Sequence, residues 1–232
     1  MSHFACLVFT EHNPLDDEYY SELEKALGPY DETMPVDPYI EEKAEDLFKP
    51  ERLSAEYGID ADLSREEAKS LLERDGYKFD EHDNMLSTYN PNSKWDYWCV
   101  GGRWENYLKL IDGTRANVAK VSDLRMWQTE QEREDLKQTF ERYTTTPGEG
   151  AYFQQYYLEQ YGDADTYADS LAPHRTRCVI TPDGVWHEVG SMWWWGFSSE
   201  SREDIIEWNK NYEKNFIEPY MDYYVTVVDC HI

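Results

Sequence analysis

Two strongly apolar segments lie at the two ends of the chain. Phe4–Thr10 reads FACLVFT, and Tyr223–Ile232 reads YYVTVVDCHI. Short runs rich in β-branched and aromatic residues are typical of buried strands. A further pair of strands is predicted at Thr176–Thr181 and Val185–Val189, because Pro182-Asp183-Gly184 between them is a strong turn signal.

Between these strands, apolar residues recur with the spacing of amphipathic helices. Helices are predicted at Asp16–Leu27, Tyr39–Phe48, Ser64 to about Asp75, Ser122–Tyr143, Ala151–Tyr161 and Ser201–Phe216. The third of them begins at a capping box, Ser64 with Glu67. Trp104–Ile111 instead alternates as a strand and precedes Asp112-Gly113, a hairpin turn signal.

These elements predict a single α+β domain over residues 1–232. We expect a mostly antiparallel sheet with the N- and C-terminal strands adjacent, as in ferredoxin-like folds, and with helices on one face. Residues 11–83 contain 24 acidic and 8 basic residues and are largely helical by pattern. This stretch is predicted to be an acidic helical insertion within the domain.

The chain is acidic, with a formal net charge of −26 at pH 7. That charge argues against a protein that binds duplex DNA by neutralising its phosphates. It leaves two interpretations open, a solvated acidic surface that maintains solubility and a surface that mimics nucleic acid. Residues 94–125 differ from the rest, since six basic residues there outnumber four acidic ones. An anion-binding site in an acidic protein would have this pattern.

The four cysteines are widely spaced and contain no CxxC pair, so no zinc site is predicted. Cys6 and Cys178 lie in apolar runs and are expected to be reduced core residues. The apolar run Phe4–Phe9 is too short for a signal peptide or a membrane span. We therefore expect a cytoplasmic protein without a membrane association and without a cofactor.

The segment Ser87–Trp104, STYNPNSKWDYWCVGGRW, has neither a helical nor a strand period. Its lysine and arginine are suited to phosphate, its tryptophans to stacking on a flat ring, and Gly101-Gly102 to close approach of an anion to backbone amides. Asp96 is expected to fix Arg103 or Lys94. Core packing is the alternative role for about half of the tryptophans. The predicted ligand-binding residues are Asn90, Lys94, Trp95, Asp96, Trp98, Arg103 and Trp104.

The two terminal strands suggest a second group of residues. If they pair antiparallel, His3 faces His231 within one or two positions, and Asp229 shares the face of His231. Two histidines and an aspartate in contact could serve as acid and base for phosphodiester cleavage, or hold a metal ion. Exposed, idle histidines near the chain ends are the remaining alternative. His3, His231 and Asp229 are the predicted catalytic residues.

Five blocks of the sequence together resemble a widespread family of bacteriophage proteins of unknown activity. They are MSHF at 1–4, LGPYDE at 27–32, the segment 87–104, DGVWHEVGSMWWWGF at 183–197 and VVDCHI at 227–232. Tyr97-Trp98 stands where the family has tryptophan followed by tyrosine, so both positions remain aromatic. The resemblance supplies no catalytic residues, but it implies a phage protein that acts in an infected bacterial cell.

Three functions are compatible with these observations. The first is a metal-independent phosphodiesterase that cleaves a cyclic nucleotide immune signal of the host. The second is a sponge, often a homo-oligomer, that binds the same nucleotide without cleaving it. The third is an acidic inhibitor that mimics DNA or binds a host protein through residues 11–83.

Overall fold

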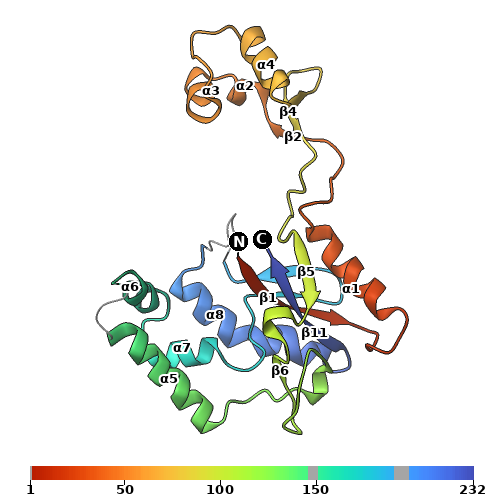
Figure 1. Ribbon diagram of the computed structural model, residues 1–232, viewed down its shortest axis with the longest axis vertical. Coiled ribbons are helices and arrows are strands. Elements are labelled where there is room, and N and C mark those ends of the chain that lie inside the picture. Colours follow the sequence, from red (N-terminus) through yellow and green to blue (C-terminus); the bar gives the residue numbers. More distant parts are fainter. Residues whose placement is uncertain (1, 146–150, 191–198) are drawn as a thin grey trace. The chain divides into compact units, whose positions relative to one another are not determined.

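The computed structural model describes residues 2–145, 151–190 and 199–232 (Figure 1). The chain forms two compact units, of which the first combines Met1–Asp31 with Lys94–Ile232 and the second is Glu32–Ser93. The tryptophan run at 193–195 lies outside the described residues.

A six-stranded sheet organises the first unit. Its strands run in the order β10-β9-β1-β11-β5, and β8 also pairs with β11. These strands are β1 (His3–Thr10), β5 (Tyr97–Val100), β8 (Val118–Lys120), β9 (Cys178–Ile180), β10 (Trp186–Glu188) and β11 (Tyr224–His231). The terminal strands β1 and β11 pair antiparallel over their whole length, and His3 is the register partner of His231. The predicted adjacency of the two chain ends is therefore confirmed, as Figure 1 shows.

The α+β class and the mostly antiparallel sheet are confirmed, but the ferredoxin-like strand order is not found. A ferredoxin-like fold contains a central hairpin, and the second strand of that hairpin lies beside the first strand of the fold. The corresponding hairpin here is β9–β10. Here the first strand of the hairpin, β9, lies beside β1 and is parallel to it, with Cys6 opposite Cys178. The long connection before β9 permits this parallel pairing.

The prediction of helices on one face only is wrong, because both faces of the sheet are covered. Leu7 and Phe9 point to a core shared with the C-terminal helix α8 (Arg202–Tyr212) and the π-helical turn Glu213–Ile217 that continues it. Cys6 and Val8 point to the opposite core, which helix α1 (Tyr19–Leu27) completes. Alternate residues of β1 thus serve two cores, which explains its nearly continuous apolar sequence.

The described part of the first unit contains three further helices, of which the first two were predicted with other bounds and the third was not predicted. They are α5 (Glu130–Thr145), α6 (Ala151–Gln160) and α7 (Ala164–Ser170). The hairpin signal at Asp112-Gly113 is confirmed, since it joins the short strands β6 (Leu108–Lys109) and β7 (Arg115–Ala116). The strand predicted from Trp104 begins later, because Gly102–Trp104 forms a 3-10 turn. Among the described residues, none of the helices combines the length and the apolar character that crossing a membrane requires.

The second unit has its own small sheet and core. Its elements are β2 (Tyr39–Glu42), α2 (Ala44–Leu47), α3 (Pro50–Tyr57), α4 (Arg65–Arg74), β3 (Lys78–Phe79) and β4 (Met85–Ser87). Leu47, Leu53, Leu72 and Met85 are buried together in it. The capping box at the start of α4 is confirmed. The helix predicted from Tyr39 is half wrong, because Tyr39–Glu42 pairs with β4 as a strand.

The second unit begins later than the acidic insertion predicted at 11–83. Helix α1 belongs to the first unit because Tyr19, Leu23 and Leu27 are buried against the sheet. Tyr19 also shares a buried hydrogen bond with Thr226 of β11 (Oη to Oγ1, 2.8 Å). A helical, acidic pattern could not reveal this, since it does not specify which core a helix covers.

Removing the second unit is expected to leave the first unit folded. The two ends that it joins are neighbours in the first unit, because Lys94 and Trp95 donate backbone hydrogen bonds to the carbonyl of Tyr30 (2.7 and 3.3 Å). A linker of about four Gly and Ser residues in place of 32–93 spans such a gap. The variant should unfold cooperatively on heating, measured by circular dichroism. A molten or aggregated product would contradict this prediction.

His174 makes the stability of the first unit depend on pH. Its ring is buried, Nε2 lies 3.2 Å from the Arg125 carbonyl, and burial lowers the pKa of the imidazole to about 4. The unfolded chain binds the proton more readily, so this contribution is fully present above about pH 6.5 and is lost as pH falls towards 4. The loss amounts to about 3 kcal/mol. Asn tolerates the left-handed backbone at this position (φ 64°). Denaturant unfolding of His174→Asn should therefore show a flatter pH dependence than that of the unchanged protein.

Candidate active site at the chain ends

Two histidine–carboxylate pairs lie side by side where β1 begins and β11 ends. His3 Nδ1 is 2.8 Å from Asp229 Oδ1, and His231 Nδ1 is 2.5 Å from Asp96 Oδ1. The two imidazole rings are in edge contact, with centroids 4.8 Å apart. The structure thus brings together the three predicted catalytic residues and adds Asp96 to them.

The sheet determines this geometry. His3 and His231 are register partners, and Asp229 lies two residues before His231 on the same face. The backbone N–H of Asp96 donates to the His231 carbonyl (3.0 Å), which places Asp96 at the start of β5 beside the end of β11. The prediction that Asp96 fixes Arg103 or Lys94 is therefore wrong, because its carboxylate bonds His231.

Each imidazole uses its Nδ1 for a carboxylate and leaves Nε2 without a hydrogen-bond partner among the described residues. The side chains of His3 and His231 are 20% and 16% exposed, so solvent reaches the pair. A carboxylate on Nδ1 fixes the ring and the tautomer that presents Nε2. Such a nitrogen can accept or donate a proton at a substrate. Within the described part of the chain, no three histidine, cysteine or acidic side chains are placed to hold a metal ion.

Asp229 is anchored from a second side by the Gly-Gly-Arg-Trp sequence. The backbone N–H of Arg103 donates to Asp229 Oδ2 (2.9 Å), and only 5% of the Asp229 side chain is exposed. The sequence pattern predicts that backbone amides of this turn hold the anion of a ligand, whereas in the structure the Arg103 amide holds the carboxylate of Asp229.

The two glycines are needed for this approach. Gly101 and Gly102 have φ values of 75° and 54°, which favour glycine. A Cβ on Gly102 would lie 2.4 Å from Asp229 Oδ2, and one on Gly101 would lie 2.7 Å from Asn117 Nδ2. The 3-10 turn therefore packs on Asp229 more closely than any other residue allows.

Two other residues share the face of the histidines. Tyr97 is the register partner of His231, and Cys99 is the partner of Asp229. Tyr97 is 61% exposed, so its ring is available beside the imidazoles. Burial and the neighbouring Asp229 raise the pKa of the Cys99 thiol, which makes it a poor nucleophile. Tyr97, which the predicted set of ligand-binding residues omits, is thus an exposed aromatic residue on the face of the histidines.

The predicted stacking residues Trp95 and Trp98 lie on the other face of the sheet. Trp95 is 5% exposed and belongs to the core beneath α1, and Trp98 packs against the same core. Core packing, the alternative considered for these tryptophans, is their role. Trp104 is half-buried on the core of the histidine face.

Of the two predicted phosphate contacts, only Arg103 remains available. Lys94 Nζ bonds Glu188 Oε1 of β10 (2.7 Å), and Glu188 lies on the face of Cys178, opposite the histidines. The guanidinium of Arg103 is exposed and makes no hydrogen bond or ion pair with the described residues. Asn90 belongs to the second unit, where its Oδ1 accepts the backbone N–H of Asn92 (3.0 Å) in a turn.

The excess of basic residues at 94–125 is mostly neutralised in the fold. Lys109 and Arg125 both bond Glu132 Oε1 at 2.8 Å, and these partners hold the pKa of Glu132 far below its ordinary value. Lys120 lies 3.8 Å from Asp222. Among the described residues, four of the six basic side chains at 94–125 thus form ion pairs, and Arg103 and Arg115 form none.

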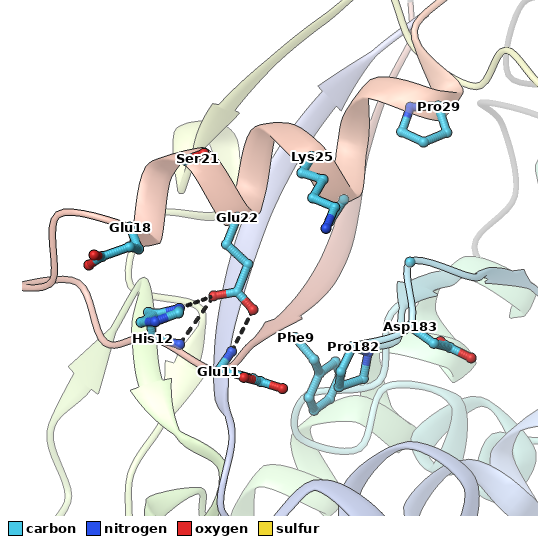
Figure 2. Close-up of a pocket in the computed structure, with 12 residues that line it drawn as sticks. Phe9, Glu11, His12, Glu18, Ser21, Glu22, Lys25, Pro29, Pro182 and Asp183 are labelled. Carbon is cyan, nitrogen blue, oxygen red and sulfur yellow. Dashed lines mark hydrogen bonds and ion pairs between the residues drawn. The ribbon is translucent and has the colours of Figure 1, made fainter.

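A separate hollow of about 640 Å³ lies between α1 and the turn at Pro182–Gly184 (Figure 2). Figure 2 shows Lys25 pointing into it, and Glu22 bonded to the loop after β1. The Glu22 carboxylate accepts the backbone N–H groups of Glu11 and His12 (2.7 and 3.1 Å) and lies 3.0 Å from His12 Nδ1. The side-chain bond to Glu22 raises the pKa of His12, and the three bonds together hold the loop, so this histidine has a structural role.

No model of a protein family, no curated protein and no solved structure gives a match to this chain. The function therefore has to be argued from the chemistry of the site itself.

Proposed function

We propose that this protein is a phosphodiesterase in which His3 and His231 act as acid and base. The observation that carries the proposal is the contact of the two rings, 4.8 Å between centroids, with a carboxylate on the Nδ1 of each. One neutral imidazole accepts a proton at Nε2, and one imidazolium donates a proton from Nε2. Each transfer contributes about 10²–10⁴-fold to the rate.

The other residues of the site support these two. Asp229 and Asp96 orient the rings and stabilise the imidazolium that forms during each step. Arg103 is tied to the site through its bond to Asp229, and its free guanidinium is suited to the charge on a phosphoryl group. Tyr97 offers an exposed ring for stacking on a base.

A small nucleotide is a better substrate than a polynucleotide. The protein carries a net charge of −26, so repulsion grows with each phosphate that is brought to it. A cyclic di- or oligonucleotide brings few charges and still offers a base to Tyr97. Because five blocks of the sequence resemble bacteriophage proteins, we propose that the protein acts in the cytoplasm of an infected cell and cleaves a host immune signal.

The first experiment is mass spectrometry of cyclic di- and oligonucleotides and cyclic ADP-ribose isomers after incubation with the purified protein. A chelator is present, and a heat-denatured aliquot of each mixture is analysed alongside. A linear product formed by the native protein supports the proposal. The rate should show a bell-shaped pH profile, because one imidazole must be neutral and the other protonated.

Two results would contradict the proposal. A ligand that leaves the filtrate and returns intact after denaturation identifies a nucleotide sponge, for which a homo-oligomer is expected. If every compound stays free and intact, the acidic surface becomes the candidate, because residues 32–93 form a separate unit with 17 acidic and 7 basic residues. In that case the variant without this unit should lose its biological effect while His3 variants keep it.

A further inference from the structure

The site presents two proton-transfer groups to one small region. Both Nδ1 atoms are bound by carboxylates, and the rings are in contact on adjacent strands. An acid and a base whose rings are 4.8 Å apart can act on the two oxygens of one phosphorus atom, one belonging to the nucleophile and the other to the leaving group. The rigid sheet register fixes their separation before any substrate binds.

Acid and base alone supply only part of the rate that a phosphodiester needs. Two proton transfers contribute about 10²–10⁴-fold each. A nucleophile that is already part of the substrate reacts at an effective concentration of about 10⁵–10⁸ M, because no second molecule has to be positioned. A ribose hydroxyl next to the phosphate is such a nucleophile, whereas a water molecule needs a binding site of its own.

We propose, on the basis of the function proposed above, that the nucleophile is the 2′-hydroxyl of the substrate. One imidazole takes the proton of the 2′-hydroxyl at Nε2 while the O2′–P bond forms. The P–O5′ bond breaks, and the other imidazole gives its proton from Nε2 to O5′. The products are a 2′,3′-cyclic phosphate and a 5′-hydroxyl, and no water is consumed.

This mechanism defines the substrate class. The protein cleaves 3′–5′-linked cyclic di- and oligoribonucleotides, in which each phosphate has a free 2′-hydroxyl beside it. Cyclic ADP-ribose isomers remain intact, because their pyrophosphate joins 5′ positions and has no neighbouring hydroxyl. Cyclic AMP also remains intact, because its six-membered ring prevents O2′ and O5′ from lying in line at phosphorus.

The test compares 3′,3′-cyclic di-AMP, cyclic di-GMP and cyclic GMP–AMP with their 2′-deoxy analogues, under identical conditions and with liquid chromatography before mass spectrometry. Opening a ring by the 2′-hydroxyl gives a linear isomer of unchanged mass, whereas hydrolysis adds the mass of one water. We expect the ribonucleotide to give the isomer at a rate at least 100-fold above that of the 2′-deoxy analogue. The His3→Asn variant should form the isomer about 10²–10⁴-fold more slowly than the unchanged protein.

The possible results separate this inference from the proposed function. Cleavage of the 2′-deoxy analogue at a similar rate, with a gain of one water, overturns the 2′-hydroxyl mechanism and leaves the phosphodiesterase intact. A ribonucleotide product that carries the mass of one water from its first appearance does the same. If all six compounds remain intact, both the inference and the proposed function fail.

Discussion

Replacing His3 or His231 by asparagine is expected to lower turnover about 10²–10⁴-fold and to leave the fold and the ligand affinity nearly unchanged. The amide nitrogen of asparagine can replace Nδ1 as the donor to the carboxylate, so Asp229 and Asp96 keep their hydrogen bonds. Nε2, the atom that transfers the proton, is lost. The measurements are the steady-state rate on the cleaved nucleotide, the affinity for a 2′-deoxy analogue and the melting temperature.

His82→Asn is the matched control, because the His82 side chain is 75% exposed in the second unit. This variant should retain full activity. The pH profile gives a further test, since each of the two active-site variants should lose one limb of the bell. Turnover close to that of the unchanged protein in either variant would remove that histidine from the mechanism.

Replacing Gly102 by alanine is expected to destabilise the first unit by about 2–5 kcal/mol and to reduce turnover strongly. The added Cβ meets Asp229 Oδ2 at 2.4 Å and Asp229 Cβ at 2.5 Å. Relief of this clash must move the turn or the buried carboxylate, and either movement breaks the bond from the Arg103 amide. The left-handed backbone adds about 1–2 kcal/mol for any residue with a Cβ, and an unsatisfied buried carboxylate adds about 1–3 kcal/mol or more.

The Gly113→Ala variant separates the cost of the left-handed backbone from the cost of the clash with Asp229. Gly113 also has a positive φ, 88°, but a Cβ there meets no atom within 4 Å. Its variant should therefore show only the backbone cost and keep full activity. Denaturant unfolding and turnover of the two variants, measured side by side, should differ by the cost of the clash. Equal stability and equal activity in both would show that Gly102 does not position Asp229.

The contact between His3 and His231 was predictable from the sequence. The terminal strands are strongly apolar, each carries a histidine at its outer end, and antiparallel pairing alone brings His3 opposite His231. The period of two residues then places Asp229 on the same face. Local patterns also predicted the capping box at Ser64 and the hairpin at Asp112-Gly113, because these signals depend on neighbouring residues only.

For the segment Ser87–Trp104, in contrast, the sequence did not predict which residues lie together. Its residue types suggested one site, but strand β5 sends Tyr97 and Cys99 to the histidine face and Trp98 to the core on the other face. Asp96 bonds His231 because β5 pairs with β11. Lys94 acquired Glu188 from β10, almost a hundred residues further along the chain. No local pattern carries this information, because each partner is set by the order of strands in the sheet.

By itself, the sequence determined the strands at the chain ends, the α+β class and the pair His3–His231, since all of these follow from hydrophobic period and register. The tertiary structure alone decided that both faces of the sheet are covered, that the second unit spans 32–93, and that Asp96 and Arg103 complete the site. The pattern of hydrophobic residues specifies which side chains are buried. The neighbours of each buried side chain depend instead on how elements far apart in the sequence pack together.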